Sequence, residues 1–375
     1  MAKFGFLSHS DMSIYFFRAP IMRELQRLGH EVFAIAPCGN YTANLEKEFI
    51  SVNYDLDKAS LNPLKVSQNT ANLAGILKGL NLDFLQTSAH KSNVFGTFAA
   101  KKAGISRVLN LVEGLGSFYI DTDLKSRMVK FSIEMLYKRA FAQSQGCIFV
   151  NDSDPDYMLS RGLISENKIF RIKSVGVNSE IFAEFAHERA SLPEITKGKK
   201  IVLMSGRALW HKGIAEFYKA AEILKERKDA CFVFAGDVFA GNKSSADEAF
   251  LRSGNVVWLG WRDDVAQLYK ACDIFVLPSY KEGFPRTVLE AMSMSRPCVV
   301  SDVSGCIEAV EDGVNGLICK VRNASDLARK IETLLDDESL AHKMGQAGRK
   351  MVVENYDEKI IAKKYIEIYR KFIDV

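Results

Sequence analysis

The stretch Pro278–Ala291, PSYKEGFPRTVLEA, places two carboxylates eight residues apart across a predicted strand-to-helix junction. The apolar run Ile274–Leu277 before it predicts a short buried strand, and Thr287–Met294 predicts the helix that follows. A Gly-Phe-Pro turn joins the two. Backbone N–H groups at this turn and at the helix start are available to a ligand, and the helix dipole favours an anion there. The stretch therefore predicts an α/β sheet with a binding site at the strand ends.

The two carboxylates belong to Glu282 and Glu290. Glu282, at the strand end, can accept hydrogen bonds from sugar hydroxyls, and Glu290, about two turns into the helix, can reach a ribose diol. With a diphosphate between them, these groups predict a nucleotide-sugar site. Taken alone, the same spacing also fits an ordinary strand-turn-helix whose two glutamates face solvent.

A second loop, Ser205–Gly213 (SGRALWHKG), follows the apolar run Ile201–Met204 and carries two cations. Arg207 offers a planar fork of donors and Lys212 a compact point charge, which together suit the two phosphates of a diphosphate leaving group. A basic surface loop without a ligand is the alternative. Its position in the same half of the chain as Glu282 and Glu290 favours a shared donor site.

The rest of the chain alternates between predicted strands and helices, which indicates parallel sheets. A charged segment at 176–198, with little apolar pattern, is the best candidate for a linker between two such series. The predicted strands are 2–8, 32–36, 84–87, 108–112 and 147–150 in the first series and, in the second, one that begins at 201 followed by 231–235, 256–259, 274–277 and 298–301. The predicted helices include 17–29, 64–80 and 96–104.

Composition limits the classes of partner. The 375 residues are long enough for two cores, and the net charge of +4 is unevenly split, with residues 1–175 carrying 21 Lys+Arg against 16 Asp+Glu. This basic half suits an anionic acceptor or a membrane surface, and no nucleic-acid-binding signature is present. Seven cysteines without a C-x-x-C pair predict reduced thiols and a cytoplasmic location. No apolar run is long enough to span a bilayer.

The segment 124–142 predicts a basic amphipathic helix with apolar residues near helical spacing. Two interpretations are open. The helix can lie on anionic lipid, as a peripheral membrane protein would require, or it can pack its apolar side on the sheet. Its cations are Lys125, Arg127, Lys130, Lys138 and Arg139.

Together these motifs resemble the retaining glycosyltransferases of family 4, in which glycines such as Gly236, Gly260 and Gly283 follow apolar runs. The strings GHEV at 29–32, SVGVN at 174–178, SGC at 304–306 and GVNG at 313–316 extend the resemblance over most of the chain. It implies a GT-B fold, α/β, with two Rossmann-like doubly wound domains facing an interdomain cleft. The implied domains are an acceptor-binding domain at 1–175, a nucleotide-sugar-binding domain at 176–357 and a helix at 358–375 that crosses back to the first.

Four longer strings are similar to one subgroup of that family: SAHKSN at 88–93, LVEGLGSFYID at 111–121, RALWHKG at 207–213 and LPSYKEGFP at 277–285. These enzymes of bacterial protein N-glycosylation add the first N-acetylgalactosamine to undecaprenyl-diphospho-N,N'-diacetylbacillosamine in α-1,3 linkage. The resemblance implies UDP-N-acetylgalactosamine (UDP-GalNAc) as donor, an undecaprenyl-diphosphate-linked sugar as acceptor and an anionic membrane surface on the inner face of the cell membrane. It implies no cofactor and no divalent metal, with the UDP-sugar as co-substrate.

The resemblance also assigns donor-side roles, and the catalytic candidates among them are Arg207, Lys212 and Glu282. The two cations would hold the departing diphosphate, and Glu282 would orient the donor sugar while Glu290 binds the ribose. Backbone groups of the turn and the helix start would assist, and an aromatic or basic residue after another strand would pack on the uracil. These further donor-binding candidates are Gly283, Phe284, Pro285, Thr287 and Val288, and Trp261 or Arg262 for the base.

On the acceptor side the chain departs from the family. Many members place a histidine after the strand that is here 108–112, whereas this chain has Glu113. That carboxylate could accept a hydrogen bond from a sugar hydroxyl or stabilise positive charge at the anomeric carbon. His90, beside Lys91, is the other catalytic candidate. In the first loop, which lacks paired glycines, we expect acceptor diphosphate contacts from His9, Ser13 and Arg18.

Several alternatives stay open. A metal-dependent transferase would use an Asp-x-Asp motif, and the chain has such pairs at 55/57, 121/123, 152/154 and 154/156. A UDP-sugar epimerase of the same fold, a transferase of lipopolysaccharide or capsule assembly, or a sensor that binds the donor without transfer would share the donor site. A nicotinamide dehydrogenase is excluded, because Gly5–Ser13 has no G-x-G-x-x-G.

Overall fold

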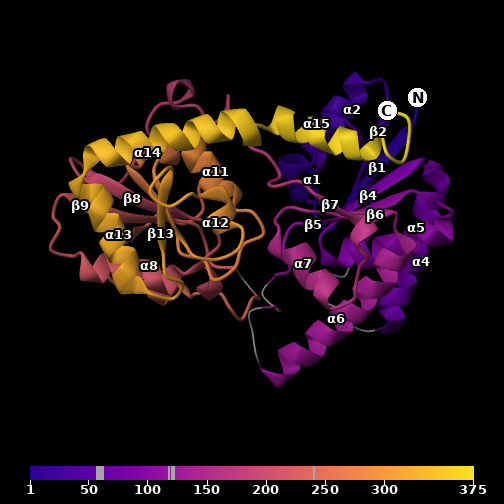
Figure 1. The fold of residues 1–375 in the computed structure, drawn as a ribbon, viewed down its shortest axis with the longest axis horizontal. Coiled ribbons are helices and arrows are strands. Elements are labelled where there is room, and N and C mark those ends of the chain that lie inside the picture. Colours follow the sequence, from indigo (N-terminus) through magenta and orange to yellow (C-terminus); the bar gives the residue numbers. More distant parts are fainter. Residues whose placement is uncertain (56–62, 117–118, 120–122, 240) are drawn as a thin grey trace. The chain divides into compact units, whose positions relative to one another are not determined.

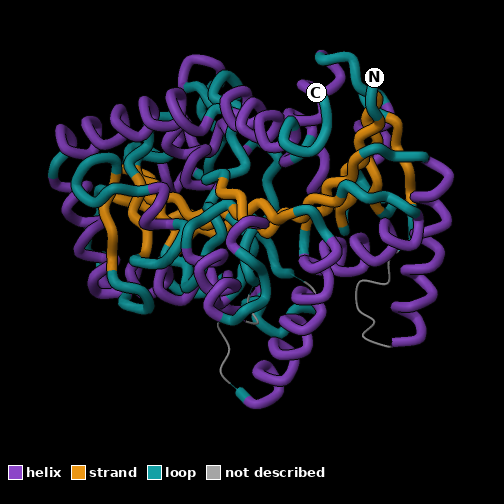
Figure 2. The backbone as a smooth tube through the Cα atoms, turned by 45° about the vertical axis from the view of Figure 1, so that its right-hand side comes forward, coloured by secondary structure: helices purple, strands orange, loops and turns teal. Residues whose placement is uncertain are grey.

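The described strands form two sheets, both wholly parallel, one in each of two units. The computed structural model describes residues 1–55, 63–116, 119, 123–239 and 241–375. The first unit consists of Met1–Gly176 together with Lys359–Val375, and the second of Val177–Glu358. Helices flank the strands of each sheet on both faces (Figure 2). The two Rossmann-like, doubly wound domains expected from the sequence are thereby confirmed.

The first unit holds a seven-stranded sheet in the order β3-β2-β1-β4-β5-β6-β7. Its strands are β1 (Lys3–Ser8), β2 (Glu31–Ala36), β3 (Ile50–Asn53), β4 (Phe84–Ser88), β5 (Val108–Val112), β6 (Gly146–Phe149) and β7 (Ile169–Arg171). Its helices are α1 (Asp11–Phe17), α2 (Ala19–Arg27), α3 (Thr42–Glu46), α4 (Pro63–Leu80), α5 (Thr97–Ala103), α6 (Leu124–Gln143), α7 (Ser153–Ser160) and most of α15 (Glu358–Tyr369), with a π-helical turn η1 (Ser92–Gly96) before α5.

Alternating residues of the central strands bury opposite faces of this sheet. Leu7, Ile35 and Leu85 join the core beneath α4 and α5. Their neighbours point the other way, and the rings of Phe4 and Phe84 lie 6.0 and 4.9 Å from that of Tyr369 in α15. Because both faces are covered, the strands read as nearly continuous apolar runs rather than as an alternation with polar residues.

The second unit holds a six-stranded sheet in the order β10-β9-β8-β11-β12-β13. Its core is shared with α8 and α13 on one face, α11 lies on the other, and α14 contacts both α13 and α11 (Figure 1). The strands are β8 (Lys200–Ser205), β9 (Ala230–Ala235), β10 (Val256–Trp258), β11 (Ile274–Leu277), β12 (Cys298–Ser301) and β13 (Gly316–Cys319). The helices are α8 (Ile214–Ile223), α9 (Glu248–Leu251), α10 (Val265–Ala271), α11 (Arg286–Ser293), α12 (Cys306–Ala309), α13 (Ala324–Asp336) and α14 (Glu338–Met351).

The stretch that opened the sequence analysis has the predicted form, since β11 ends at Leu277 and α11 begins at Arg286, one residue before the predicted start. The segment expected to be a linker contains only two short 3-10 helices, Glu184–Ala186 and Glu194–Thr196. The helix predicted over 17–29 is confirmed as α2, at Ala19–Arg27, whereas the short helix α1 before it, which meets α2 at Arg18, was not predicted.

Candidate active site

In the second unit, one lysine and one glutamate from separate loops form a tight ion pair. Lys212 ends a 3-10 turn after β8, and its Nζ lies 2.6 Å from Oε1 of Glu282 in the loop after β11. The hydroxyl of Ser279 donates to the same oxygen at 2.6 Å. The Glu282 carboxylate is therefore fixed through one oxygen before any ligand arrives, and its side chain is only 10% exposed.

Two glycines let these loops approach backbone to backbone. At Gly213, with φ of +78°, a Cβ would lie 2.1 Å from the carbonyl oxygen of Pro278, and Gly305, with φ of +80°, would place one 2.4 Å from the carbonyl oxygen of Gly283. Any other residue would be strained and would clash at both positions. The loops that follow β8, β11 and β12 are thus packed together at the carboxyl ends of the strands, where open α/β sheets bind ligands.

Glu290, the second predicted carboxylate, is buried in α11 and has two partners. Nε of Arg286 donates to Oε1 at 2.9 Å, and the hydroxyl of Tyr269 donates to Oε2 at 3.2 Å. The Oγ of Ser205 lies 3.0 Å from the same Tyr269 hydroxyl. Burial raises the pKa of the Glu290 carboxyl, and the charge of Arg286 opposes this. A ribose diol at Glu290 would therefore meet an oriented carboxyl group.

The remaining donor-binding candidates lie in the turn before α11 and at the start of that helix. The Phe284 ring is buried and packs 5.3 Å from that of Tyr356, so this residue offers a ligand only its backbone. The Val288 amide already donates to the carbonyl of Pro285 at 3.2 Å. Two other candidates, Gly283 and Thr287, stand at the turn and in the first turn of α11.

The cation expected beside Lys212 stands apart from the ion pair. Arg207 is exposed, its guanidinium lies 5.3 Å from the ring centre of Phe239, and within the described chain it forms no ion pair with Glu282. The structure thus brings Lys212 to Glu282 and leaves Arg207 on the surface.

The two candidates for the uracil lie in the loop after β10. Trp261 is 63% exposed, and its indole N–H donates to Asp263 at 2.8 Å. The guanidinium of Arg262 pairs with Asp264, with Nε 2.7 Å from Oδ1. Of the two, Trp261 keeps an accessible ring face on which a base could stack.

In the first unit, His90 stands at the start of the helical segment that follows β4. The residue before it, Ala89, has a φ of 73°, a conformation rarely adopted by residues other than glycine. Nδ1 of His90 lies 2.6 Å from the hydroxyl of Tyr137 in α6. Burial, with a smaller contribution from the nearby His9, lowers the pKa of His90 to about 4. The imidazole is therefore neutral at physiological pH.

A buried polar network fixes the helical segment that begins at His90. The hydroxyl of Thr87 donates to the side-chain oxygen of Asn93 at 2.8 Å, and the amide of Asn93 donates to the carbonyl of Leu111 at 2.8 Å. Asn110 in turn donates to Thr87 at 2.8 Å. These bonds tie the carboxyl ends of β4 and β5 together.

Glu113 directly follows β5 and is paired with Arg18. Nη2 of Arg18 donates to Oε1 of Glu113, and Nη1 lies 3.5 Å from the hydroxyl of Tyr365 in α15. The Arg18 side chain is 1% exposed and that of Glu113 25% exposed. Burial alone would lower the pKa of the Arg18 guanidinium, but Glu113 and Tyr365 more than offset it, so the pKa is raised. This burial disfavours the predicted direct contact between Arg18 and an acceptor diphosphate.

The other acceptor candidates differ in accessibility. His9 and Lys91 are partly buried at the ends of β1 and β4, whereas Ser13 is buried in α1 with 5% of its surface exposed. The nearby Asp11 accepts from the backbone N–H of Tyr41 at 2.8 Å and so fixes the loop after β2. The first unit therefore gathers His9, His90 and Glu113 at the carboxyl ends of three adjacent strands.

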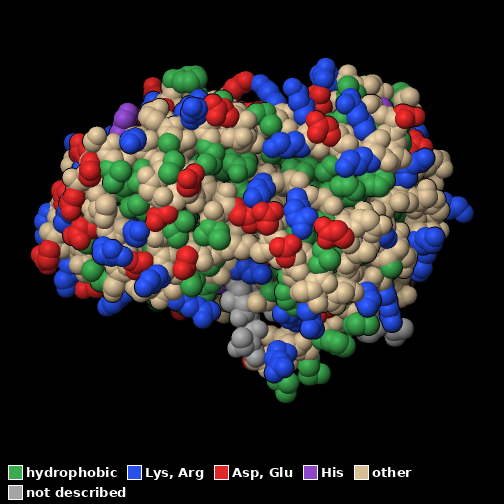
Figure 3. Space-filling view, in the orientation of Figure 1, with side chains coloured by type: hydrophobic (Ala, Val, Ile, Leu, Met, Phe, Trp, Pro, Cys, Tyr) green, Lys and Arg blue, Asp and Glu red, His purple; other side chains and the backbone are tan. Residues whose placement is uncertain are grey.

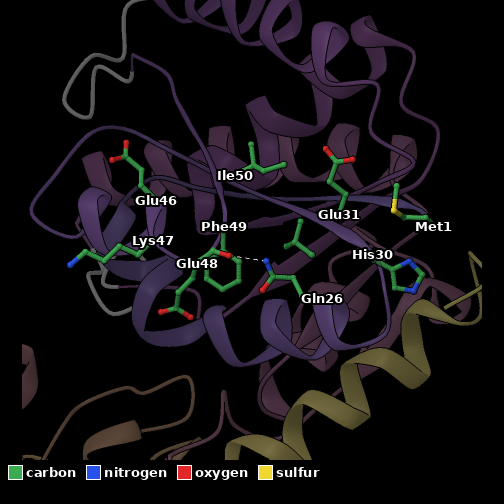
Figure 4. Close-up of a pocket in the computed structure, with 10 residues that line it drawn as sticks. Met1, Gln26, His30, Glu31, Glu46, Lys47, Glu48, Phe49 and Ile50 are labelled. Carbon is green, nitrogen blue, oxygen red and sulfur yellow. Dashed lines mark hydrogen bonds between the residues drawn. The ribbon is translucent and has the colours of Figure 1, made fainter.

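A pocket at the amino ends of the strands of the first sheet contains none of these candidates. It is lined by residues at the starts of β1, β2 and β3 and by α2, including Met1, Gln26, His30, Glu31, Glu48 and Ile50 (Figure 4). There the side-chain amide of Gln26 donates to the carbonyl of Glu48 at 2.8 Å. Because ligands of open α/β sheets bind at the carboxyl ends of strands, this pocket does not mark the reaction site.

In one of the Asp-x-Asp pairs, at 152/154, both carboxylates have partners within the protein. Asp152 binds Lys173 at 2.7 Å, and Asp154 accepts from Asn151 at 3.0 Å at the start of α7. The pairs at 55/57 and 121/123 lie partly outside the described residues. Among the residues described, no three His, Cys, Asp or Glu side chains are grouped as metal ligands. None of the described helices is long and apolar enough to cross a membrane.

The two doubly wound units, with a carboxylate-lysine pair at the strand ends of one and a polar cluster at the strand ends of the other, define the class of two-domain GT-B glycosyltransferases. Solved structures agree on the fold. HepE from Anabaena in complex with UDP and glucose superposes with a TM-score of 0.80 at 18% identity, covering 99% of this chain and 100% of that one. Sucrose-phosphate synthase from Thermosynechococcus elongatus gives a TM-score of 0.80 at 17% identity, covering 99% of both chains.

The sequence comparisons go further. The family model described as glycosyl transferases group 1 matches residues 188–351. The N,N'-diacetylbacillosaminyl-diphospho-undecaprenol alpha-1,3-N-acetylgalactosaminyltransferase of Campylobacter jejuni is 46% identical, over 99% of both chains. An Escherichia coli UDP-Gal:alpha-D-GlcNAc-diphosphoundecaprenol alpha-1,3-galactosyltransferase is 26% identical over 95% of both. The chain belongs to the group 1 glycosyl transferases and is a glycosyltransferase.

Proposed function

We propose that this chain transfers N-acetylgalactosamine from UDP-GalNAc to undecaprenyl-diphospho-N,N'-diacetylbacillosamine, forming an α-1,3 linkage with retention at the anomeric carbon. The observation that carries the proposal is the 46% identity, over 99% of the chain, to the Campylobacter jejuni enzyme named for this reaction. The fixed Lys212–Glu282 pair at the strand ends supports the donor half of it.

On the donor side, Glu282 orients the sugar and Lys212 carries the positive charge nearest to it. As the bond between the anomeric carbon and the diphosphate breaks, negative charge grows on the leaving oxygens, and Lys212 stabilises that charge. Arg207, on the same loop but unpaired with Glu282, is free to turn its guanidinium toward the diphosphate. Glu290 binds the ribose, and Trp261 stacks on the uracil.

On the acceptor side, retention proceeds by attack from the face that the diphosphate leaves. The acceptor hydroxyl forms the new bond to the anomeric carbon, and its proton passes to an oxygen of the departing diphosphate. Glu113 accepts a hydrogen bond from a hydroxyl of the acceptor sugar. His90, held neutral, acts as a hydrogen-bonding group rather than as a cation. No step in this sequence requires a metal ion.

The test is a transfer assay with the purified chain in EDTA. With both substrates, the lipid acceptor should gain the mass of one N-acetylhexosamine, and UDP should be released in equal amount. Turnover of the nucleotide sugar without acceptor would instead indicate an epimerase. A requirement for added magnesium would overturn the metal-free part of the proposal.

We also propose that the first unit binds the anionic inner face of the cell membrane through α6. Four residues spaced at four, three and four positions form one exposed apolar stripe: Leu124, Met128, Phe131 and Met135, with 72, 65, 60 and 39% of their surfaces exposed. The opposite side of the helix is buried through Tyr137 and Phe141. One face of α6 therefore packs on the sheet, and the other face, which carries the exposed stripe, is the one that we propose lies on lipid.

Cations beside the stripe support an anionic lipid as its occupant. Arg127, Lys138 and Arg139 are exposed on α6, and hydrophobic and basic side chains gather together at the end of this helix (Figure 3). Apolar residues that enter the acyl region, flanked by cations at the headgroups, are the pattern of an interfacial helix. Because the proposed acceptor is carried on an undecaprenyl chain in the membrane, contact between α6 and the lipid would bring the enzyme to its substrate.

A further inference from the structure

We infer that Arg18 is a positioning residue, which holds the Glu113 carboxylate in the orientation that the transfer reaction needs. This inference rests on the proposed function and deepens it, because it assigns the orientation of the acceptor-side carboxylate to a buried residue and to the last helix of the chain.

The geometry of the pair is one-sided. Arg18 binds Glu113 through Oε1, and within the described chain Oε2 has no hydrogen-bond partner. Because Glu113 is partly exposed while Arg18 is not, one oxygen is anchored in the interior and the other is available to a sugar. The hydroxyl of Tyr365 lies 3.5 Å from Nη1 of Arg18, so α15 helps to hold the guanidinium in place.

A purely structural role explains this arrangement poorly. The Nε of Arg18 is buried without a hydrogen-bond partner among the residues described, so the guanidinium is only partly satisfied. Burying a charge and leaving one of its donors unpaired costs stability, and an apolar side chain of similar volume is often as stable as a buried ion pair. The cost is understandable if Arg18 serves the orientation of Glu113.

The chain has a matched control in the same unit. Arg23, in α2, also pairs with a glutamate, with its Nε 2.6 Å from Oε2 of Glu48, but both side chains are exposed and Glu48 lies just before the start of β3, not at the carboxyl ends of the strands. Arg23→Met therefore removes an arginine-glutamate pair of the same kind without touching Glu113.

The experiment is a double-mutant cycle measured by the transfer assay. Arg18→Met should lower kcat by about 10 to 100-fold, while the KM for UDP-GalNAc changes by less than about twofold. In a Glu113→Gln background, the same substitution should lower kcat by no more than about twofold, because the group through which Arg18 acts is already changed. Arg18→Lys should recover part of the loss, and Arg23→Met should match the wild type.

Three results would overturn the inference. Equal losses from Arg18→Met in both backgrounds would show that Arg18 acts independently of Glu113. An increase confined to the KM for the lipid acceptor would indicate direct binding of its diphosphate. If Arg18→Met fails to fold, Tyr365→Phe takes its place, and a loss of kcat that persists in the Glu113→Gln background would count against the inference. An inactive wild-type chain would instead refute the proposed function, and the inference with it.

Discussion

At the scale of single residues, the proposed donor site depends on a carboxylate that is oriented by neighbours elsewhere in the sequence. The carboxylate of Glu282 forms an ion pair with Lys212, 70 residues earlier, and accepts a hydrogen bond from the hydroxyl of Ser279 in its own loop. A preorganised pair of this kind does not have to reorganise when the leaving group departs, which is the condition under which electrostatic stabilisation is largest.

We predict that Lys212→Met lowers kcat by about 100-fold or more, since it removes the cation nearest the leaving group and frees Glu282 to reorient. The comparison variant is Lys225→Met. Lys225 also forms an ion pair, with Glu222 at 2.9 Å, but it is exposed. Steady-state kinetics with UDP-GalNAc would measure both. A Lys212→Met enzyme within about twofold of the wild type would contradict this role.

The partly buried His90 makes the stability of the first unit depend on pH. The folded-state pKa of His90, about 4, lies below the ordinary value of 6.5, so the unfolded chain binds a proton that the folded chain does not. The stabilisation from a neutral His90 is complete above pH 6.5 and is lost as the pH falls toward 4, by up to about 3 kcal/mol. We therefore expect His90→Gln to lose less stability than the wild type between pH 7.5 and 4.5.

Urea unfolding at the two pH values would test this expectation, with the exposed His342→Gln as control. The control should keep the pH dependence of the wild type. If His90→Gln lost as much stability as the wild type on acidification, the contribution assigned to His90 would be wrong.

At the scale of helices and strands, the sequence predicted most of the sheet. Strands β5, β11 and β12 match their predicted ranges, because buried inner strands are mostly apolar runs bounded by turn residues. Strands β3, β7 and β13 were not predicted. β3 and β7 are short and only partly buried, and all three lie at sheet edges, so their residues lack a distinctive pattern.

Less of the site could be predicted, for a physical reason. The sequence motifs indicated Lys212, Glu282 and Glu290, whose residue types and spacing carry information. They did not indicate Tyr269 at Glu290, Tyr137 at His90 or Tyr365 at Arg18, because these contacts join residues 21, 47 and 347 positions apart and an isolated tyrosine has no pattern. They also placed Arg18 at a ligand, whereas its guanidinium is buried.

The exposed stripe of α6 leads to a prediction about lipid binding. Phe131→Glu should abolish cosedimentation with vesicles that contain anionic lipid while leaving the fold intact, because Phe131 is 60% exposed and contributes apolar area rather than core packing. Phe185→Glu, the same change at a residue of the second unit that is 85% exposed, should bind vesicles like the wild type. Equal binding by both variants would exclude α6 as the membrane surface.

The C-terminal helix is predicted to be essential to the first unit. Tyr369 is fully buried against Phe4 and Phe84, and its hydroxyl donates to Gln86. Tyr369→Ala should lower the free energy of unfolding of this unit by about 3 to 5 kcal/mol, whereas Tyr369→Phe should cost only about 1 kcal/mol for the lost hydrogen bond. Urea denaturation measures both. A Tyr369→Ala protein as stable as Tyr369→Phe would show that α15 does not complete this core.

At the scale of the whole molecule, two parallel sheets each place polar side chains at the carboxyl ends of their strands. The second unit contributes the Lys212–Glu282 pair, and the first contributes His90 and Glu113. The proposed function assigns the donor to the second unit and the acceptor to the first, and the similarity to a relative named for a sugar transfer extends over both units.

The most direct test of the central claim is a competition for one acceptor. The purified chain would be incubated in EDTA with undecaprenyl-diphospho-N,N'-diacetylbacillosamine, isotope-labelled UDP-GalNAc and unlabelled UDP-N-acetylglucosamine, and the lipid would be weighed by mass spectrometry. The account predicts that each lipid gains one labelled N-acetylhexosamine. Gain of the unlabelled sugar, or no gain with either donor even after magnesium is added, would contradict it.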